Sequence, residues 1–483
     1  MSQNSQLKGA SNSHEQQDSH EEVQLQRQLG LSSSFSMITG SMLGIGIFLA
    51  PCLAARHIST SGLFFGAWIL TGMIALAGAW IYGRLGVMLP KSGGDYIFHR
   101  EAFGSSIASS YGWGLLSSAF AGSLAAMSVA LCAYQLLPLL GLPIGNLWTY
   151  ECFGETFSIT GAQCGGVVVI LLITLLNTYG LAISAKLQEV IAFVPLCALF
   201  LMCGYLFTLE PLPTVTMTTA HSSGWSFTGI SNAFLEIYFA YSGWNAIIYV
   251  AGEVKEPKKT IPIALIGGTI TVMCLYLFLC AASMHYIGLE GLRGFYEAQT
   301  DLGSGIATQL GGGWISSGMT ILVTVALLAS INATVIGGGR LAYMMAKDGC
   351  FWRGASELSH HYQTPNKALW TLCFISILIT ITIPYDLIFR LISLVMVLGG
   401  VLTSVAYYIL KYKNNPQGLS TFSPTDWILP PLFIIFSLTV MSIKISEAFI
   451  GIDGSIPPLI GLLLIVLVYL GQTIYKRLKT TRT

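Results

Sequence analysis

The feature that most constrains this chain is a series of long apolar runs. About twelve of them are long enough to cross roughly 30 Å of hydrocarbon, which takes about 20 residues of helix. Only 9% of the 483 residues are charged, whereas soluble proteins average about a quarter. The sequence therefore predicts an all-α polytopic membrane protein with 12 transmembrane helices. The predicted spans begin near residues 31, 62, 103, 163, 187, 227, 259, 314, 367, 386, 426 and 456.

The basic residues favour one orientation of these spans. If the N-terminus is cytoplasmic, 19 of the 23 Lys and Arg residues fall on the cytoplasmic side, and Arg56, Arg293, Arg390 and Lys444 remain at the outside. We therefore expect both termini in the cytoplasm and the lipid bilayer around the chain. Because the basic residues are spread over many loops and form no groove-sized patch, no nucleic-acid partner is expected.

Residues 40–48, Gly-Ser-Met-Leu-Gly-Ile-Gly-Ile-Phe, predict a break in the first span. Each glycine lowers helix propensity by roughly 1 kcal/mol relative to alanine. A break at bilayer depth leaves free amides, which suit a carboxylate, and free carbonyls, which suit an ammonium. The amides belong to Gly44, Ile45 and Gly46, and the carbonyls to Met42 and Leu43. Together these groups suit a zwitterion, although close helix packing would also explain the glycines.

A second break is expected at residues 239–245, Phe-Ala-Tyr-Ser-Gly-Trp-Asn, in the sixth span. Its glycine, Gly243, lies 199 positions after Gly44. Interrupted segments at matching places in two halves mark the central site of many transporters. The first break lies in span 1 of a five-span block and the second lies in span 6, and because five is odd the second block must be inverted. The predicted organisation is a disordered cytoplasmic tail (1–28), a first repeat (29–210), a second repeat (211–413), and spans 11–12 with a short cytoplasmic C-terminus (414–483).

The sequence offers no pattern for catalysis or for a metal. No nucleophile is paired with a base in the spans, and no cysteine or histidine spacing is typical of a metal site. We therefore expect neither an enzyme nor a bound cofactor. Cys152 and Cys164 share one outer loop, and the sequence leaves open whether they form a disulfide.

Four segments resemble the amino acid, polyamine and organocation transporters, and among these the L-type amino acid transporters and their bacterial relatives. They are the two break segments, the loop Pro-Lys-Ser-Gly-Gly-Asp-Tyr at 90–96, and Gly-Gly-Arg-Leu-Ala-Tyr-Met-Met-Ala-Lys-Asp-Gly at 338–349. The resemblance covers about residues 30–475. It implies the inverted five-plus-five fold of the sodium-coupled leucine transporters, two peripheral helices, alternating access, and a bacterial inner membrane as the location.

The resemblance also implies which residues bind substrate. Its carboxylate contacts fall on Ser41, Gly44, Ile45 and Gly46. Its amine contacts fall on the backbone carbonyls of Met42, Phe239 and Ala240. Tyr241, Ser242 and Trp244 would border or gate the side-chain pocket, next to Asn245.

Two departures from the family pattern affect the expected cargo and coupling. Pro195 stands where many L-type relatives carry a lysine, so the role of that lysine cannot be transferred. Asn245 stands where arginine/agmatine antiporters carry a glutamate, which weighs against a cationic substrate. We expect an exchanger or proton-coupled permease for a neutral L-amino acid, with Glu236 as a candidate for proton coupling or as a structural carboxylate. A polyamine or cationic amino acid antiporter, or a sensor without flux, remains the alternative, and no accessory heavy chain is expected.

Overall fold

The computed structural model describes residues 25–152, 155–212, 227–298, 300–383, 385–414, 422–450 and 457–480. Most of the predicted tail, 1–28, lies outside these ranges. Its end does not: the amides of Gln28 and Leu29 donate to the carbonyl of Glu253 at 2.8 and 2.9 Å. Leu29 is buried, so the chain is already fixed against the protein before the first helix begins.

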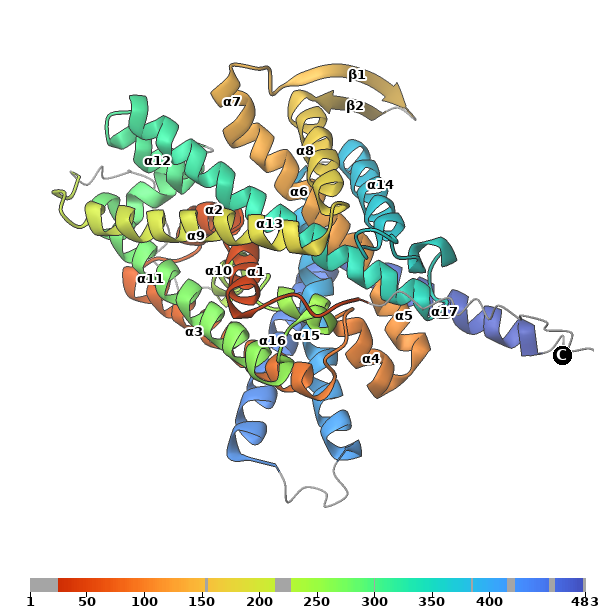
Figure 1. Cartoon of the computed structure of the whole chain (residues 1–483). Helices are drawn as coiled ribbons and strands as arrows, with labels where there is room; N and C mark the ends of the chain where they lie inside the picture. Colours follow the sequence, from red (N-terminus) through yellow and green to blue (C-terminus); the bar gives the residue numbers. More distant parts are fainter. Residues whose placement is uncertain are drawn as a thin grey trace, which may run out of the picture.

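The first half of the chain is helical apart from one hairpin (Figure 1). Its elements are α1 (Leu31–Met42), α2 (Gly46–Ala55), α3 (Ser61–Met88), α4 (Asp95–Phe103), α5 (Ser105–Gly114), the π-helical segment η1 (Leu115–Gly122), α6 (Ser123–Ala130), the π-helical segment η2 (Leu131–Leu136), α7 (Leu137–Leu140), β1 (Asn146–Cys152), β2 (Glu155–Thr160), α8 (Gly161–Asn177) and α9 (Leu181–Leu206).

The described part of the second half is entirely helical in its regular structure. Its elements are α10 (Phe227–Ala240), the 3₁₀ segment η3 (Ala246–Glu253), α11 (Pro257–Glu297), α12 (Leu302–Gln309), α13 (Gly313–Lys347), the 3₁₀ turn η4 (Arg353–Ser356), α14 (Asn366–Thr382), α15 (Tyr385–Lys413), α16 (Pro424–Ile450) and α17 (Pro457–Thr480).

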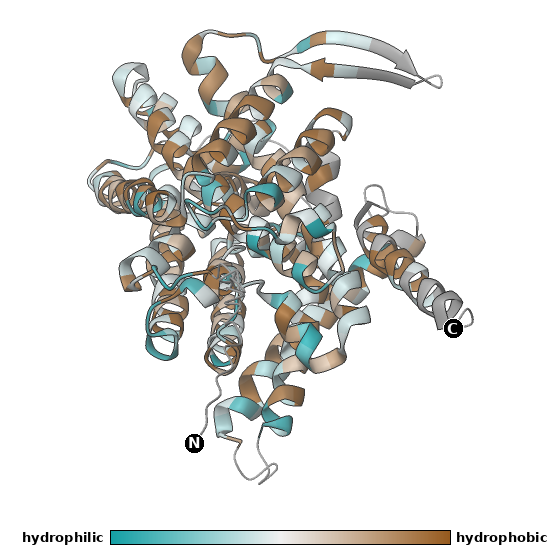
Figure 2. Ribbon diagram, turned by 45° about the vertical axis from the view of Figure 1, so that its right-hand side comes forward, coloured by the Kyte–Doolittle hydropathy of each residue, from teal (hydrophilic) through white to brown (hydrophobic). Residues whose placement is uncertain are grey.

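Within the described ranges, eight helical segments are long and apolar enough to cross a membrane. Two shorter apolar helices, α8 and α14, coincide with two more predicted spans, and α10 and α17 begin near the remaining two predicted starts. Apolar residues run along the helices on the outside of the bundle as well as within it (Figure 2). Since a soluble protein would place polar residues on its outer faces, this distribution indicates a multi-pass membrane protein.

The expectation of an all-α chain is wrong at one place. Strands β1 and β2 form an antiparallel hairpin that projects from the bundle beside α7 and α8 (Figure 1). The strands contain Trp148, Tyr150, Phe157 and Ile159, residue types that favour extended structure. Cys152 ends β1, and its side chain lies outside the described residues, whereas Cys164 on α8 is a free thiol.

Both predicted helix breaks are present. Helix α1 ends at Met42 and α2 begins at Gly46, and α10 ends at Ala240 before η3 begins at Ala246. Figure 1 shows α1, α2 and α10 in the middle of the bundle, where α1 packs against α9, α11 and α13 and α2 packs against α10. The broken segments are therefore surrounded by other helices, as interrupted backbone at membrane depth must be.

A buried ion pair fixes the far end of the second broken helix. Arg340 on α13 contacts both carboxylate oxygens of Glu253 at the end of η3, at 3.0 and 3.3 Å. Both side chains are at most 3% exposed. Removing either partner would leave the other charge buried and unpaired, so this pair holds η3 firmly to α13.

Candidate functional site

The first break is a tight turn centred on Leu43. Its dihedral angles, φ −72° and ψ 51°, and the hydrogen bond from the Gly44 amide to the Met42 carbonyl at 2.7 Å define an inverse γ-turn. The turn redirects the chain so that α2 starts afresh at Gly46. The first amides of α2 have no intrahelical acceptors, which makes this end of the helix electropositive.

The second break contains a residue that has to be glycine. Gly243 has φ +96°, a conformation that L side chains rarely adopt. A Cβ at this position would also lie 2.5 Å from Ser41 Oγ and 2.8 Å from the Ser41 carbonyl oxygen. The two breaks therefore touch each other directly, with the backbone of one against Ser41 of the other.

Helices α2 and α10, which adjoin the two breaks, also approach each other closely. A Cβ added to Gly46 would lie 2.6 Å from the Cα atom of Ala240, a backbone atom that has no freedom to move aside. At Gly44 the nearest atom would be Ser330 Oγ at 3.1 Å, the end of a side chain. A side chain at position 46 would therefore force α2 and α10 apart, whereas a side chain at position 44 would require only a movement of Ser330.

Tyr276 on α11 contacts the carbonyl groups at the C-terminal ends of α1 and α10. Its hydroxyl lies 2.5 Å from the Met42 oxygen and 3.1 Å from the Ala240 oxygen. Since the Met42 oxygen also accepts the Gly44 amide, both of its lone pairs are used. An ammonium group that binds these carbonyls would have to displace the Tyr276 hydroxyl.

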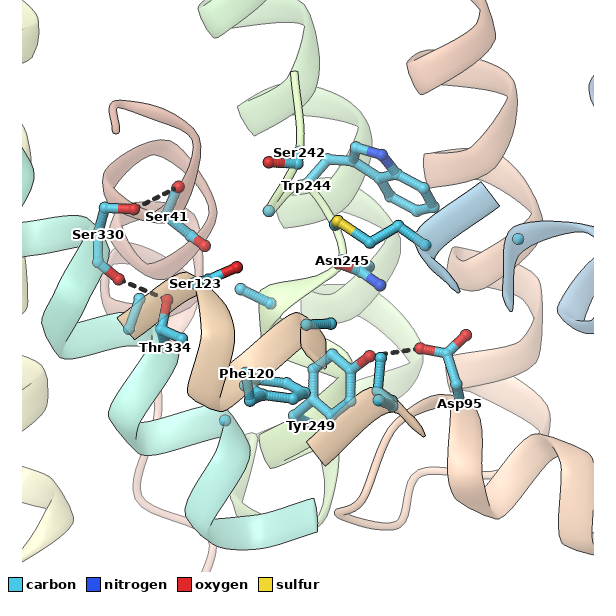
Figure 3. Close-up of a pocket in the computed structure, with 18 of the residues that line it drawn as sticks. Ser41, Asp95, Phe120, Ser123, Ser242, Trp244, Asn245, Tyr249, Ser330 and Thr334 are labelled. Carbon is cyan, nitrogen blue, oxygen red and sulfur yellow. Dashed lines mark hydrogen bonds between the residues drawn. The ribbon is translucent and has the colours of Figure 1, made fainter. Parts of the chain in front are cut away.

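A pocket of about 930 Å³, measured with its open mouth, adjoins the breaks. Figure 3 shows Ser41 and Ser330 on one side of it, Asp95 on the other, and Trp244 and Asn245 between them. Five of the predicted substrate-binding residues line it: Ser41, Phe239, Ser242, Trp244 and Asn245. Its described lining does not include the other six, Met42, Gly44, Ile45, Gly46, Ala240 and Tyr241.

Those six residues lie behind the pocket wall and are buried or nearly so. Tyr241, for example, is fully buried, and its ring packs 5.8 Å from Trp68 and 5.2 Å from Tyr276. The nearest neighbours of a side chain at Gly44 would be Ser330 and Met127, which both line the pocket, so Gly44 lies directly behind these two side chains.

The pocket walls combine aromatic rings with hydroxyl groups. Trp244 meets Tyr82 edge to face at 4.7 Å, and Phe120 meets Tyr249 edge to face at 4.8 Å. On the opposite side, Ser330 Oγ donates to the Ser41 carbonyl at 2.9 Å. Such a wall fits a small polar molecule that carries an apolar portion.

Further residues of the pocket lining were not among the substrate-binding residues predicted from the sequence. The pocket is also lined by Asp95, Phe120, Ser123, Gly243, Tyr249, Ser330 and Thr334. Ser330 and Thr334 lie four positions apart in an apolar span, the spacing that puts two hydroxyls on one helix face, and this signal was available. Asp95 was visible only as the N-terminal residue of a helix, because its distance from the breaks depends on how α4 folds back.

Glu236 lies outside the described lining of this pocket. Its Oε1 atom accepts from Arg56 Nη2 at 3.2 Å and lies 3.5 Å from His57 Nε2, and Arg56 also contacts the Tyr296 hydroxyl. Arg56 and His57 follow α2, and Glu236 lies on α10. The cluster therefore joins the same two half-helices that Gly46 and Ala240 bring together.

A chain of buried amides crosses the helices behind the first break. Asn177 Nδ2 donates to Asn332 Oδ1 at 2.8 Å, and Asn332 Nδ2 donates to Gln188 Oε1 at 2.8 Å. Gln188 Nε2 reaches the Ser36 carbonyl at 3.4 Å. These side chains connect α8, α13, α9 and α1 and carry no charge. Gln188 lies on α9, the helix that also contains Pro195, the position where many L-type relatives carry a lysine.

Comparison with known proteins agrees with this architecture. Residues 29–469 match the family model described as amino acid permease. The chain is 26% identical over 430 residues to the large neutral amino acids transporter small subunit 2 of Rattus norvegicus, covering 86% of this chain and 77% of that protein. It is 25% identical over 425 residues to the Asc-type amino acid transporter 1 of Mus musculus, covering 86% and 76%.

A bacterial relative is similar over nearly its whole length. The serine/threonine exchanger SteT of Bacillus subtilis (strain 168) is 23% identical over 419 residues, covering 86% of this chain and 91% of that protein. The matched region includes both helix breaks, the pocket residues and the helices that surround them. This chain belongs to the amino acid permease family, within the amino acid, polyamine and organocation transporter superfamily.

Proposed function

We propose that this chain is a secondary active transporter that moves a neutral L-amino acid across a cell membrane by alternating access. The proposed topology has 12 spans, an inverted repeat of five plus five spans, two peripheral helices, and cytoplasmic termini in a bacterial inner membrane. The contact between the two breaks carries the proposal, since Gly243 approaches Ser41 too closely to admit a Cβ. Two interrupted helices that meet beside a pocket suit the binding of a small zwitterion.

In the proposed bound state, the amides at the start of α2 hold the carboxylate. The ammonium replaces the Tyr276 hydroxyl at the carbonyls of Met42 and Ala240, and Phe239 contributes a third carbonyl. Ser41 supplies a hydroxyl to the carboxylate, and the substrate side chain occupies the pocket beside Trp244 and Asn245. The proposed carboxylate contacts are the amides of Gly44, Ile45 and Gly46, and Tyr241 and Ser242 are proposed to border or gate the side-chain pocket.

The neutral cargo is proposed on two grounds. The relatives' printed names refer to neutral amino acids and to serine and threonine exchange. Asn245 contributes no charge to the pocket, and the single carboxylate in its described lining, Asp95, is already hydrogen-bonded by Tyr82, Thr403 and Tyr249. We propose no catalytic role and no accessory heavy chain.

A polyamine or cationic amino acid remains the second candidate cargo, because Asp95 is an anionic group on the pocket wall. Transport by exchange or together with a proton are both compatible with the proposal. Two carboxylates compete for a proton-carrying role, Glu236 beside Arg56 and Asp95 in the pocket wall.

Counterflow in proteoliposomes tests the proposal. Vesicles that contain the purified protein are loaded with unlabelled leucine, serine or alanine, and uptake of the labelled amino acid is measured. We expect uptake that saturates and is inhibited by neutral amino acids, with arginine and putrescine at least tenfold weaker as competitors. If arginine or putrescine competes best, the cargo is cationic. If no amino acid exchanges in vesicles with correctly folded protein, the transport function is rejected.

A further inference from the structure

Asp95 is a buried carboxylate at the wall of the substrate pocket. It is the first residue of α4, it is 2% exposed, and it is the single formally charged residue in the described lining. It follows the loop Pro-Lys-Ser-Gly-Gly, which the charge distribution places on the cytoplasmic side. Asp95 therefore lies between the proposed substrate site and the cytoplasm.

Hydroxyl groups, and no cation, surround this carboxylate. Tyr82 and Thr403 donate to Oδ1, the latter at 2.6 Å, and Tyr249 donates to Oδ2 at 2.5 Å. Among the described residues, no Lys or Arg nitrogen lies within 4.0 Å of it. The three donors offset part of the cost of burying this anion, no cation in the described part of the chain offsets the rest, and binding a proton removes the charge.

Five titratable side chains from five elements face or electrostatically influence Asp95. They are Tyr82 on α3, His99 on α4, Tyr111 on α5, Tyr238 on α10 and Tyr249 on η3. Helix α15 contributes Thr403, which does not titrate. Burial lowers the pKa of His99 to about 4, which outweighs the opposite influence of Asp95, so His99 is neutral near pH 7.

The hydrogen bonds define a path from Asp95 to His99. Thr403 has one hydroxyl proton and donates it to Asp95 Oδ1, so the imidazole must donate from Nε2 to Thr403 Oγ1, 2.8 Å away. The Nδ1 atom of neutral His99 is then an unprotonated acceptor, and it is buried without a partner in the described part of the chain. The Nε2–H group of His99 therefore supports Thr403 as a donor to Asp95, and the free acceptor Nδ1 lies off this hydrogen-bonded path.

Glu236 differs from Asp95 in having a cation beside it, although its Oε2 atom is buried without a partner in the described part of the chain. Arg56 already compensates its charge at 3.2 Å, and His57 lies 3.5 Å from the same oxygen. Glu236 also lies outside the described lining of the pocket. A carboxylate paired with arginine gains little from a proton, whereas Asp95 has no ion pair to lose.

We propose that Asp95 is the proton-binding site that couples substrate movement to a proton gradient. The proton adds to a carboxylate oxygen of Asp95 to form the neutral acid, and it leaves from the same oxygen when the pocket opens to the other side. No other bond forms or breaks. This inference rests on the proposed transport function and assigns its coupling ion and the residue that binds it.

The test compares two modes of transport by the same vesicles. Uptake of the labelled neutral amino acid is driven either by a pH gradient or by an outward gradient of unlabelled substrate. For Asp95→Asn, we expect the ratio of gradient-driven uptake to counterflow to fall at least tenfold. Glu101→Gln, at a partly exposed position of the same helix, is the matched carboxylate control and should keep the wild-type ratio. Glu236→Gln tests the competing carboxylate, and the proposal expects it to keep the ratio as well.

A retained ratio in Asp95→Asn would overturn the proposal, as would loss of the ratio in Glu236→Gln alone. Wild-type vesicles that show counterflow but no uptake driven by a pH gradient would overturn the proton site and leave the transport function standing. Absence of counterflow with every neutral amino acid would overturn both.

A second measurement does not depend on transport activity. The infrared difference spectrum of the purified protein between two pH values should contain the carbonyl band of a protonated buried carboxyl group. That band should be missing in Asp95→Asn and present in Glu236→Gln. A band that persists in Asp95→Asn assigns the proton to another group and contradicts the proposal.

Discussion

The hydroxyl of Tyr276 donates to the carbonyl of Met42 at 2.5 Å, at the point where the first broken helix ends. The same hydroxyl lies 3.1 Å from the carbonyl of Ala240, where the second broken helix ends. One phenol therefore occupies the two acceptors proposed for the substrate ammonium. In this state of the molecule the site is closed by its own side chain, and binding has to exchange one donor for another.

This arrangement predicts opposite effects of Tyr276→Phe with and without substrate. Without substrate, the lost hydrogen bond leaves buried acceptors less satisfied, at a cost of about 1–3 kcal/mol, so the unfolding temperature should fall. With substrate, no hydroxyl competes with the ammonium, so the ligand-induced rise in unfolding temperature should exceed that of the wild type. Thermal unfolding of the purified protein measures both, with the exposed Tyr205→Phe as control. An equal ligand-induced rise in Tyr276→Phe and wild type would argue against competition.

The glycines of the first break should differ in their tolerance of alanine. Gly46→Ala places a Cβ 2.6 Å from the Ala240 backbone, so α2 and α10 must separate, and we expect counterflow to fall more than tenfold. Gly44→Ala meets the Ser330 hydroxyl at 3.1 Å, which can rotate, and should lose only a few-fold. Gly66→Ala, which faces open space on α3, is the control. Equal activities of the Gly44 and Gly46 variants would contradict the packing described here.

Burial of His99 predicts a pH-dependent stability. Helix α4 is outside the candidate spans, and the pKa of His99 in the folded protein, about 4, is below its ordinary value of 6.5. Between these values the unfolded chain binds a proton that the folded chain does not, so stability should fall as the pH drops from 6.5 toward 4. The full effect is on the order of 3 kcal/mol.

Unfolding midpoints at several pH values measure this slope. His99→Gln should flatten it, and the exposed His360→Gln should leave it unchanged. A slope that is the same in His99→Gln and wild type would assign the effect to other groups.

The amide chain behind the first break should be sensitive to its central member. Asn332→Ala removes the acceptor of Asn177 Nδ2, which keeps its bond to the Ile173 carbonyl, and the donor to Gln188 Oε1. The lost hydrogen bonds should lower stability by about 1–3 kcal/mol. Because Gln188 also contacts the Ser36 carbonyl, α1 should loosen from α9. Faster hydrogen exchange in α1 than in wild type checks this outcome, and Ser317→Ala at an exposed position of α13 is the control. Unchanged exchange in α1 would show that the amide chain does not fix it.

The sequence predicted the two breaks correctly because their causes are local. Glycine at 44, 46 and 243 lowers helix propensity, and apolar flanks place the breaks within the membrane. The predicted starts of the spans also lie close to the starts of observed helices, since apolar runs of sufficient length can be found from the sequence alone.

What the sequence did not predict depends on tertiary contact. The bridge made by Tyr276 joins residues that are 234 and 36 positions apart. Asp95 meets Thr403, which is 308 positions away, and the sequence did not place it at the pocket. The hairpin β1–β2 was missed because its strands are short and lie in a predicted outer loop. Neither periodicity nor composition carries information on such pairings.

Competition by amino acids blocked at one end tests most directly whether the broken helices bind both ends of a zwitterion. N-acetyl-leucine lacks the ammonium, and leucine methyl ester lacks the carboxylate. Since each charged hydrogen-bonding group contributes about 1.5–3 kcal/mol, each compound should inhibit leucine counterflow at least tenfold more weakly than leucine. If either compound competes as well as leucine, the main-chain ends at the two breaks do not hold both charged groups, and the account is wrong.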